Sequence, residues 1–242
     1  MSMKIAVCAM VKDEPDLIEW LQHHDRIGID HFFIYDNGSR EATMTVTPNV
    51  TVETFCGKSV QLQAFNKCLR EHGPHFDWIA FIDADEFIYP VHEPLKIILH
   101  DYRDCGGLVM HWSLFGSNGH LKRQPSVIDA YTQRVPFEDS TCRMVKSFVQ
   151  PARVRRFESS HWCKYKHPYH AVNTDGKPVM AGKADPAMDR LRLNHYFLRS
   201  REDMEQKCVR GWGFPDRKRT MAELEKFDVR CTVEDTGLKD AR

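Results

Sequence analysis

The alternation of short apolar segments with amphipathic helices over the first 90 residues constrains the fold of this chain most strongly. Aromatic, β-branched and small apolar side chains are concentrated in four segments that we interpret as strands, at residues 4–10, 31–35, 50–55 and 78–82. Helical spacing of apolar side chains predicts helices after the first and third strands, one with Asp13 as its N-cap and one over residues 60–71. Such βαβ units produce parallel strands, so we expect an α/β fold with a mainly parallel central sheet.

The alternation continues less regularly in the rest of the chain. A helix is expected over residues 92–102, and strands over residues 107–112, 142–149 and 190–197. Ser200 and Asp203 have the spacing of a capping box, which predicts that another helix begins there. A chain of 242 residues can bury one large core, so we expect a single domain over residues 1–230 and a polar, frayed tail at 231–242.

The composition narrows the class of partner. Lys plus Arg equals Asp plus Glu at 34 each, so the protein has no overall positive potential that would attract nucleic acid or anionic lipid. The eight cysteines are scattered without a CxxC pair, which predicts reduced thiols in a cytoplasmic setting and no zinc site. The short apolar run at the start of the sequence lacks the length of a secretory signal or of a transmembrane helix.

Three carboxylates follow the fourth predicted strand, in the sequence Phe81-Ile82-Asp83-Ala84-Asp85-Glu86-Phe87. On an extended chain Asp83 and Asp85 project to the same side, and the small Ala84 leaves room between them. Hard oxygen ligands of this kind suit Mg²⁺ or Mn²⁺, ions that usually share their coordination with the phosphates of a substrate. The alternative is a solvated acidic turn.

Polar residues also follow the first two predicted strands, at residues 12–14 and 36–39. Because parallel strands bring their carboxyl ends to one edge of a sheet, these residues and the acidic triplet should line one crevice. Such a crevice can hold a base and ribose on one side and a metal-bridged diphosphate on the other. The sequence contains neither of the glycine-rich phosphate-binding patterns, GxGxxG and GxxxxGK[ST].

Several ordered motifs carry a family resemblance. They are Val11-Lys12-Asp13-Glu14, Glu19-Trp20-Leu21 with His23-His24, Gly28-Ile29-Asp30-His31, Tyr35-Asp36-Asn37-Gly38-Ser39, Gln63 with Asn66, the segment from Trp78 to Phe87, and more loosely His111-Trp112, Phe115-Gly116-Ser117, Lys146-Ser147, His161 and Asn194-His195-Tyr196. Together they resemble glycosyltransferases of the family 2-like and family 92-like groups. The resemblance is dense over residues 4–90 and looser beyond.

The resemblance implies the GT-A fold, with a nucleotide-binding half at residues 1–90, an acceptor half at 91–230, a nucleotide-sugar donor and a divalent cation. It implies that Asp83 and Asp85 lie at the metal, with His195 as a late ligand; the alternative for His195 is a hydrogen-bonded core residue. The implied donor contacts are Val11, Lys12, Glu14, Asp36, Asn37, Gln63, Asn66, Asp83, Ala84 and Gly116. For the residues of the loops the alternative is ordinary turn chemistry, and for Gln63 and Asn66 it is capping of a neighbouring loop.

Transfer of a sugar requires a base that takes the proton of the acceptor hydroxyl. The order of motifs favours Asp139, with Glu138 and Glu86 as rivals; a solvated acidic loop is the alternative for residues 138–139. The segment at residues 153–170 mixes cationic and aromatic side chains and is an acceptor wall, a pyrophosphate contact or an exposed basic loop. Lys207, Arg210 and the turn at residues 212–215 are expected to close over the site.

The sequence therefore predicts an inverting, metal-dependent hexosyltransferase that uses a UDP-sugar and a saccharide or glycolipid acceptor. The resemblance further suggests polysaccharide or lipopolysaccharide synthesis, with peripheral association at a membrane. Two other functions remain open, a sugar-phosphate nucleotidyltransferase and a non-catalytic carbohydrate-binding module on the same fold.

Overall fold

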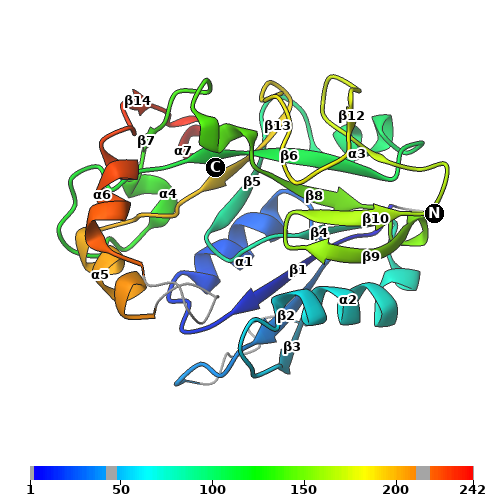
Figure 1. Cartoon of the computed structure of the whole chain (residues 1–242), viewed down its shortest axis with the longest axis horizontal. Coiled ribbons are helices and arrows are strands. Elements are labelled where there is room, and N and C mark those ends of the chain that lie inside the picture. Colours follow the sequence, from blue (N-terminus) through cyan, green and yellow to red (C-terminus); the bar gives the residue numbers. More distant parts are fainter. Residues whose placement is uncertain (1–2, 42–47, 211–218, 242) are drawn as a thin grey trace.

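A computed structural model describes residues 3–41, 48–210 and 219–241 (Figure 1). The first half of the chain contains β1 (Ile5–Val11), α1 (Leu17–Arg26), β2 (His31–Asp36), β3 (Val50–Thr54), α2 (Gln61–Glu71), the 3-10 helix η1 (Gly73–His75), β4 (Trp78–Phe81), β5 (Glu86–Pro90), α3 (Leu95–Asp101) and β6 (Gly107–Leu114). The second half contains α4 (Val127–Ala130), β7 (Gln133–Arg134), η2 (Ser140–Arg143), β8 (Val145–Val149), η3 (Pro151–Arg153), β9 (Val154–Ser159), β10 (Trp162–Tyr165), β11 (Ala171–Val172), β12 (Pro178–Val179), β13 (Leu191–His195), α5 (Arg201–Arg210), α6 (Met221–Asp228), β14 (Val233–Glu234) and α7 (Gly237–Asp240).

A mixed sheet organises the molecule, with the strand order β12-β11-β6-β8-β4-β1-β2-β3. The strands β3, β2, β1 and β4 are parallel, as the sequence predicts for the first 90 residues. Beyond β4 the sheet changes direction, because β8 runs antiparallel to both β4 and β6. Strand β13 pairs in parallel with β6 and antiparallel with β5, so His195 lies opposite Glu86. Glu86 ends the acidic turn, the segment 82–86 that joins β4 to β5 and carries Asp83, Asp85 and Glu86.

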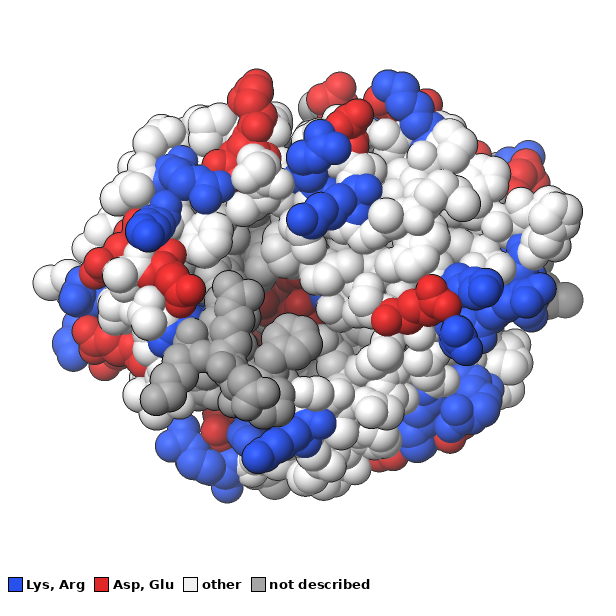
Figure 2. Space-filling model, viewed as in Figure 1, with Lys and Arg blue, Asp and Glu red and all other residues white. Residues whose placement is uncertain are grey.

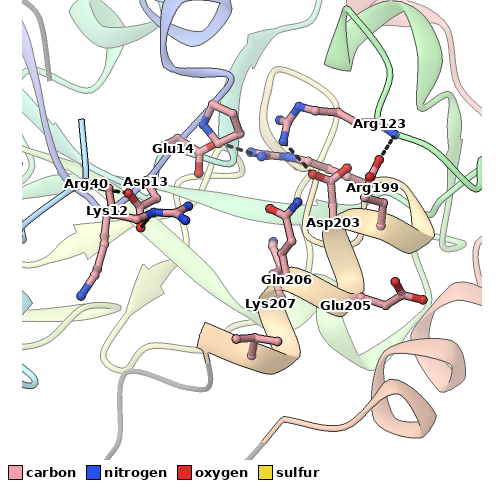
Figure 3. Close-up of a pocket in the computed structure, with 13 residues that line it drawn as sticks. Lys12, Asp13, Glu14, Arg40, Arg123, Arg199, Asp203, Glu205, Gln206 and Lys207 are labelled. Carbon is pink, nitrogen blue, oxygen red and sulfur yellow. Dashed lines mark hydrogen bonds and ion pairs between the residues drawn. The ribbon is translucent and has the colours of Figure 1, made fainter. Parts of the chain in front are cut away.

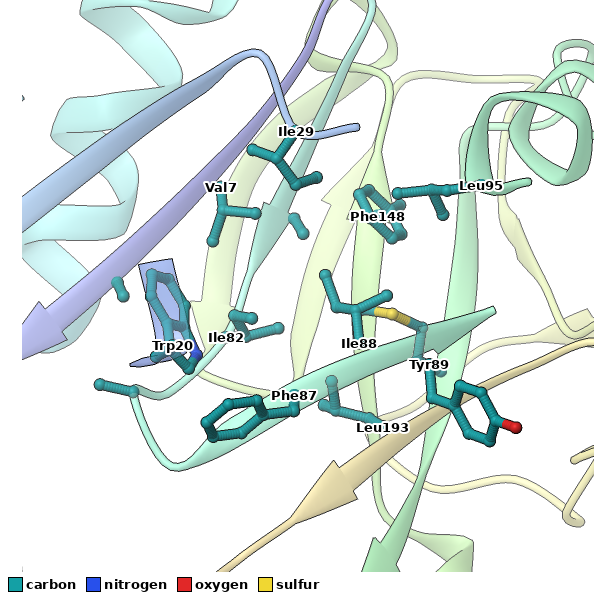
Figure 4. Packing of buried hydrophobic residues seen from close by; sticks show 14 of the residues in the cluster. Val7, Trp20, Ile29, Ile82, Phe87, Ile88, Tyr89, Leu95, Phe148 and Leu193 are labelled. Atoms are coloured by element: carbon teal, nitrogen blue, oxygen red, sulfur yellow. The ribbon is translucent and has the colours of Figure 1, made fainter. Parts of the chain in front are cut away.

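The alternation of side chains along β1 creates two cores on the two faces of the sheet. Ile5, Val7 and Ala9 pack with the side chains of α1 and α3, and Figure 4 shows part of this cluster around Val7 and Trp20. Ala6 and Cys8 face the other side, where α2 and the β9–β10 hairpin supply the apolar partners. Helices on both faces make this a three-layer α/β fold.

The polar residues after β1 and β4 have a different local structure from the one that the sequence predicts. Asp13 has φ +48° and accepts a hydrogen bond from the Arg40 backbone N–H, and α1 begins only at Leu17. Strand β4 ends at Phe81, and Ala84 and Asp85 form a turn. The two aspartates therefore do not follow the alternation of an extended strand, and the prediction that they share one side on that ground is wrong.

The prediction of a frayed tail at residues 231–242 is also wrong for the described residues up to 241. Strand β14 pairs with β7, and Leu238 is buried in the large core. The Asp235 carboxylate accepts a hydrogen bond from Arg134 at 2.6 Å and lies 3.2 Å from a guanidinium nitrogen of Arg192. All three side chains are nearly buried, so the carboxylate is an anionic partner shared by two arginines inside the protein.

We predict that Asp235→Asn destabilises the protein by about 3 kcal/mol, because breaking a buried ion pair leaves uncompensated charge. The substitution keeps the shape of the side chain and removes only its charge. Glu234→Gln, on the exposed neighbouring residue, is the matched control and should leave the free energy of unfolding unchanged. Urea unfolding of both variants measures the difference, and equal stability of the two would show that the tail is not anchored by this pair.

Candidate functional site

The loops that follow β1 and β2 are joined by one hydroxyl group. Ser39 donates from its Oγ to the Asp36 carboxylate at 2.8 Å, and the same oxygen accepts from the Asp13 backbone N–H at 2.9 Å. Asn37 accepts from the Gly57 N–H at 2.8 Å. Asp36 and Asn37 thus have the turn contacts that were the alternative to nucleotide binding, and their role in binding stays a prediction.

Asp83 lies between α2 and β8. Its Oδ1 accepts from the Gln61 amide at 2.5 Å, and its Oδ2 accepts from the Lys146 ammonium at 2.8 Å. Burial by itself raises the pKa of Asp83, but the charge and the hydrogen bond of Lys146, together with His161, outweigh this effect and the net pKa is lowered. Asp83 is therefore a carboxylate with both oxygens in use, although about a third of its side chain stays exposed.

Asp85 is held from the other side, by β13 and α5. Its Oδ1 lies 3.3 Å from His195 Nε2, and its Oδ2 accepts from the Lys207 ammonium at 2.8 Å. The Asp85 carbonyl also accepts from the Tyr196 backbone N–H, which fixes the turn against the end of β13. Burial raises the pKa of Asp85, but Lys207 and then His195 outweigh it, so the pKa is well below the usual range.

Glu86 and Lys146 form the buried floor of this site, and both side chains are fully inaccessible. Glu86 Oε2 accepts from the Asp83 backbone N–H at 2.8 Å and lies 3.9 Å from Lys146 Nζ. Burial raises the pKa of Glu86 well above its usual range, which favours the neutral acid. A fully buried side chain cannot touch an acceptor hydroxyl, so the structure argues against Glu86 as the catalytic base.

A cleft of about 640 Å³ lies between the loop after β1 and helix α5 (Figure 3). Its lining is strongly charged and consists of Lys12, Asp13, Glu14, Pro15, Arg40, Arg123, Arg199, Glu202, Asp203, Glu205, Gln206, Lys207 and Val209. Lys207 connects this cleft to the acidic turn, because it lines the cleft and contacts Asp85. Figure 2 shows a hollow with acidic side chains on its floor near the centre of the face in view.

Arg199 is the buried cation at the wall of this cleft. It has φ +59°, is 3% exposed, and contacts Glu14 and Asp16 at 2.7 Å each. Burial lowers the pKa of Arg199, but Glu14 and then Asp16 outweigh it and raise the pKa, so the guanidinium is charged. Its Nε and Nη2 atoms have no hydrogen-bond partner among the described residues.

Three of the residues implied as donor contacts have other partners in the structure. Gln63 can donate to the backbone carbonyls of Ser59 and Val60, at the start of α2. Asn66 exchanges hydrogen bonds with the Phe157 backbone and so joins α2 to β9. Gly116 lies where an added Cβ would come within 2.6 Å of the Cys231 side chain. These contacts account for the three residues without a ligand, and their roles as donor contacts stay predictions.

Asp139 is the N-cap of η2. Its Oδ1 accepts from the Thr141 backbone N–H at 2.8 Å, and its Oδ2 accepts from Arg230 at 2.8 Å. Burial raises the pKa of Asp139, but the contacts with Arg230 and the Thr141 hydrogen bonds together outweigh it and the net pKa is lowered. A carboxylate engaged in this way is a weak proton acceptor, which argues against the predicted role as base. Glu138 is exposed beside it.

Two further segments were predicted to line or close the site, the one at residues 153–170 and the turn at residues 212–215. Residues 154–165 form the β9–β10 hairpin, whose Phe157 and Cys163 pack in the second core while Arg155 and Arg156 are exposed. The turn at residues 212–215 lies outside the described residues. Gln61 and Arg199 do not stand out in the sequence. Gln61 is distinguished only by its contact with Asp83, and Arg199 only by its burial among carboxylates.

The capacity of the site for a cation depends on two protein ligands. The described residues contain no group of three or more His, Cys, Asp or Glu side chains arranged to hold a metal ion. Asp85 and His195 nevertheless present an oxygen and a nitrogen 3.3 Å apart. Because Mg²⁺ and Mn²⁺ sites for nucleotides use one or two protein ligands and complete the shell with phosphates and water, this pair fits such an ion when a phosphorylated ligand is bound.

The sheet and the cleft together define an α/β protein with a cleft at the carboxyl end of strand β1. The sequence model of glycosyltransferase family 92 matches residues 59–180. A glycosyltransferase family 92 protein of rice (Oryza sativa subsp. japonica) is 29% identical over 98% of this chain and 43% of its own length. A family 92 protein of Ricinus communis is 26% identical over 98% of this chain and 46% of its length, and one of Arabidopsis thaliana is 31% identical over 37% and 17%.

The chain belongs to glycosyltransferase family 92. It spans less than half the length of the rice and Ricinus relatives. Within the described residues, no helix combines the length and the apolar character needed to cross a membrane.

His161 lies beside Lys146, with its Nδ1 3.0 Å from the Val145 carbonyl oxygen. Burial, followed by the charge of Lys146, lowers the pKa of His161 from 6.5 to about 4. In this window the unfolded chain binds the proton and the folded protein does not, so the stability falls as the pH falls from 6.5 to 4.

We predict that His161→Gln removes this part of the pH dependence, by up to about 1.4 kcal/mol per pH unit. Urea unfolding at several pH values between about 4 and 6.5 measures the slope. His92→Gln, on an exposed histidine, is the control and should keep the slope of the wild type. A His161→Gln variant with the wild-type slope would show that His161 is protonated normally.

Proposed function

We propose that this chain is a GT-A glycosyltransferase domain that transfers a hexose from a UDP-sugar to a saccharide or glycolipid acceptor, with a divalent cation and inversion at the anomeric carbon. The observation that carries the proposal is the position of the Asp85–His195 pair beside a cleft whose lining includes both cationic and acidic side chains. Family membership supports sugar transfer, and the uridine, the hexose and the inverting course rest on the sequence resemblance.

The cationic side chains of the cleft suit the diphosphate of a donor. Lys12, Arg199 and Lys207 line it, and two nitrogen atoms of Arg199, Nε and Nη2, have no partner among the described residues. The positive charge of Arg199 at this wall attracts phosphate oxygens, while its unpaired nitrogens are themselves buried. Glu14 and Asp16 hold Arg199 in place, so this donor of hydrogen bonds is oriented before a ligand arrives.

Asp85 and His195 are the residues that would hold the cation, and the bound cation would supply positive charge against the departing diphosphate. Asp83 is then a positioning residue: it orients Gln61 and neutralises Lys146. Asp139 is ion-paired with Arg230, so the exposed Glu138 remains the candidate for the base that deprotonates the acceptor. All eight cysteines are free thiols, which supports a cytoplasmic setting, because thiols stay reduced there.

We predict that Asp85→Asn lowers the affinity for UDP in the presence of Mn²⁺ by on the order of 100-fold, since an amide removes the charge that attracts the cation. The control is Asp175→Asn, on an exposed aspartate paired only with Lys177, and it should bind UDP as the wild type does. Calorimetry with UDP and Mn²⁺ measures both affinities.

Release of UDP from a panel of UDP-sugars tests the reaction itself. If the wild type with Mn²⁺ neither binds UDP nor releases it from any of these donors, the proposal is wrong. Affinity for a glycan without affinity for a nucleotide would identify a carbohydrate-binding module. Release of pyrophosphate from a nucleoside triphosphate and a sugar phosphate would identify a nucleotidyltransferase.

A further inference from the structure

Lys207 occupies a place between the acidic turn and the cleft. Its Nζ atom donates to Asp85 Oδ2 at 2.8 Å and also to the Phe197 carbonyl oxygen, and its side chain is 6% exposed. The same residue lines the cleft beside Gln206 on α5 (Figure 3). A lysine has a flexible stem of four carbons, so its ammonium can exchange one anionic partner for another without movement of the helix.

The Asp85 carboxylate can pair with Lys207 or bind a divalent cation, and these two positive charges repel each other. His195 is near one oxygen of this carboxylate and the lysine is bonded to the other. A cation held by Asp85 and His195 would therefore lie next to the ammonium of Lys207. Electrostatic repulsion at such short range favours a lysine that leaves the carboxylate when the cation binds.

Lys146 makes the same kind of contact but is not exchangeable in this way. It projects from β8 inside the sheet, is fully buried, and has both Asp83 and Glu86 as neighbours. Lys207 instead belongs to a helix whose first turn is fixed by the capping box between Ser200 and Asp203. Of these two lysines, Lys207 is the one that also lines the cleft.

We propose that Lys207 is a placeholder for the divalent cation at Asp85, and that it turns from this carboxylate to the diphosphate of the donor when the cation binds. This inference rests on the proposed function. Without a cation, Lys207 neutralises Asp85; with a cation, the released ammonium is a phosphate-binding group in the cleft. Binding of the cation and of the nucleotide are consequently coupled, and each raises the affinity for the other.

The test compares Lys207→Met with the wild type in two titrations, one with Mn²⁺ alone and one with UDP in the presence of Mn²⁺. Methionine keeps an unbranched side chain and removes the competing charge. We expect Mn²⁺ alone to bind more tightly to the variant, and UDP with Mn²⁺ to bind more weakly, with a change of about 5- to 150-fold in each case. A lysine with only a structural role would not shift the two affinities in opposite directions.

Two further variants serve as controls. Lys207→Arg keeps the charge and should retain weak binding of Mn²⁺ alone, and Lys177→Met, on an exposed lysine remote in sequence, should change neither affinity. A circular dichroism melt shows whether Lys207→Met is folded. If it is not, the same two titrations are carried out with Lys207→Gln, which is polar and uncharged.

The outcomes separate this inference from the proposed function. If the wild type binds UDP with Mn²⁺ but the uncharged variant binds Mn²⁺ alone no more tightly, the placeholder is ruled out and the proposed function stands. If the uncharged variant binds UDP with Mn²⁺ as well as the wild type does, Lys207 does not contact the diphosphate. If the wild type binds neither ligand, both proposals fail together.

Discussion

Compensation of charge at the β4–β5 turn is the constraint on which the site depends. The turn brings Asp83, Asp85 and Glu86 into a largely buried position, where an isolated carboxylate is strongly unfavourable. Lys146 neutralises one aspartate from within the sheet, and Lys207 neutralises the other from α5. Glu86, the third carboxyl group, avoids a buried charge because its raised pKa favours the neutral form.

The two lysines come from parts of the chain that are distant from the turn in sequence. Lys146 reaches Asp83 because β8 runs antiparallel to β4, with Ser147 opposite Phe81. Lys207 reaches Asp85 because α5 follows β13, which itself pairs with β5. The second half of the chain therefore completes a site whose acidic residues all come from the first half.

A second group of ion pairs fixes α5 against the loop after β1. Arg199 joins Glu14 to Asp16, and Arg123 joins Asp16 to Asp203 on the first turn of the helix. These contacts are largely buried, so they restrict the position of α5 more than exposed pairs would. The wall of the cleft and the lysine that adjoins the acidic turn are consequently held by one network.

The sequence by itself determined the α/β alternation, the parallel amino-terminal strands, the Ser200 capping box and the convergence of polar strand ends, because these follow from local periodicity and from strand direction. Its apolar β1 and β4 were found within one or two residues. Only the tertiary structure decided the partners of the carboxylates. The spacing of Gln63 and Asn66 suggested a function, whereas Gln61 is the residue that contacts Asp83. Asp139 pairs with Arg230, which lies 91 residues further along the chain. Pairings of this kind depend on burial and on strand order between distant segments, which local patterns of residues do not encode.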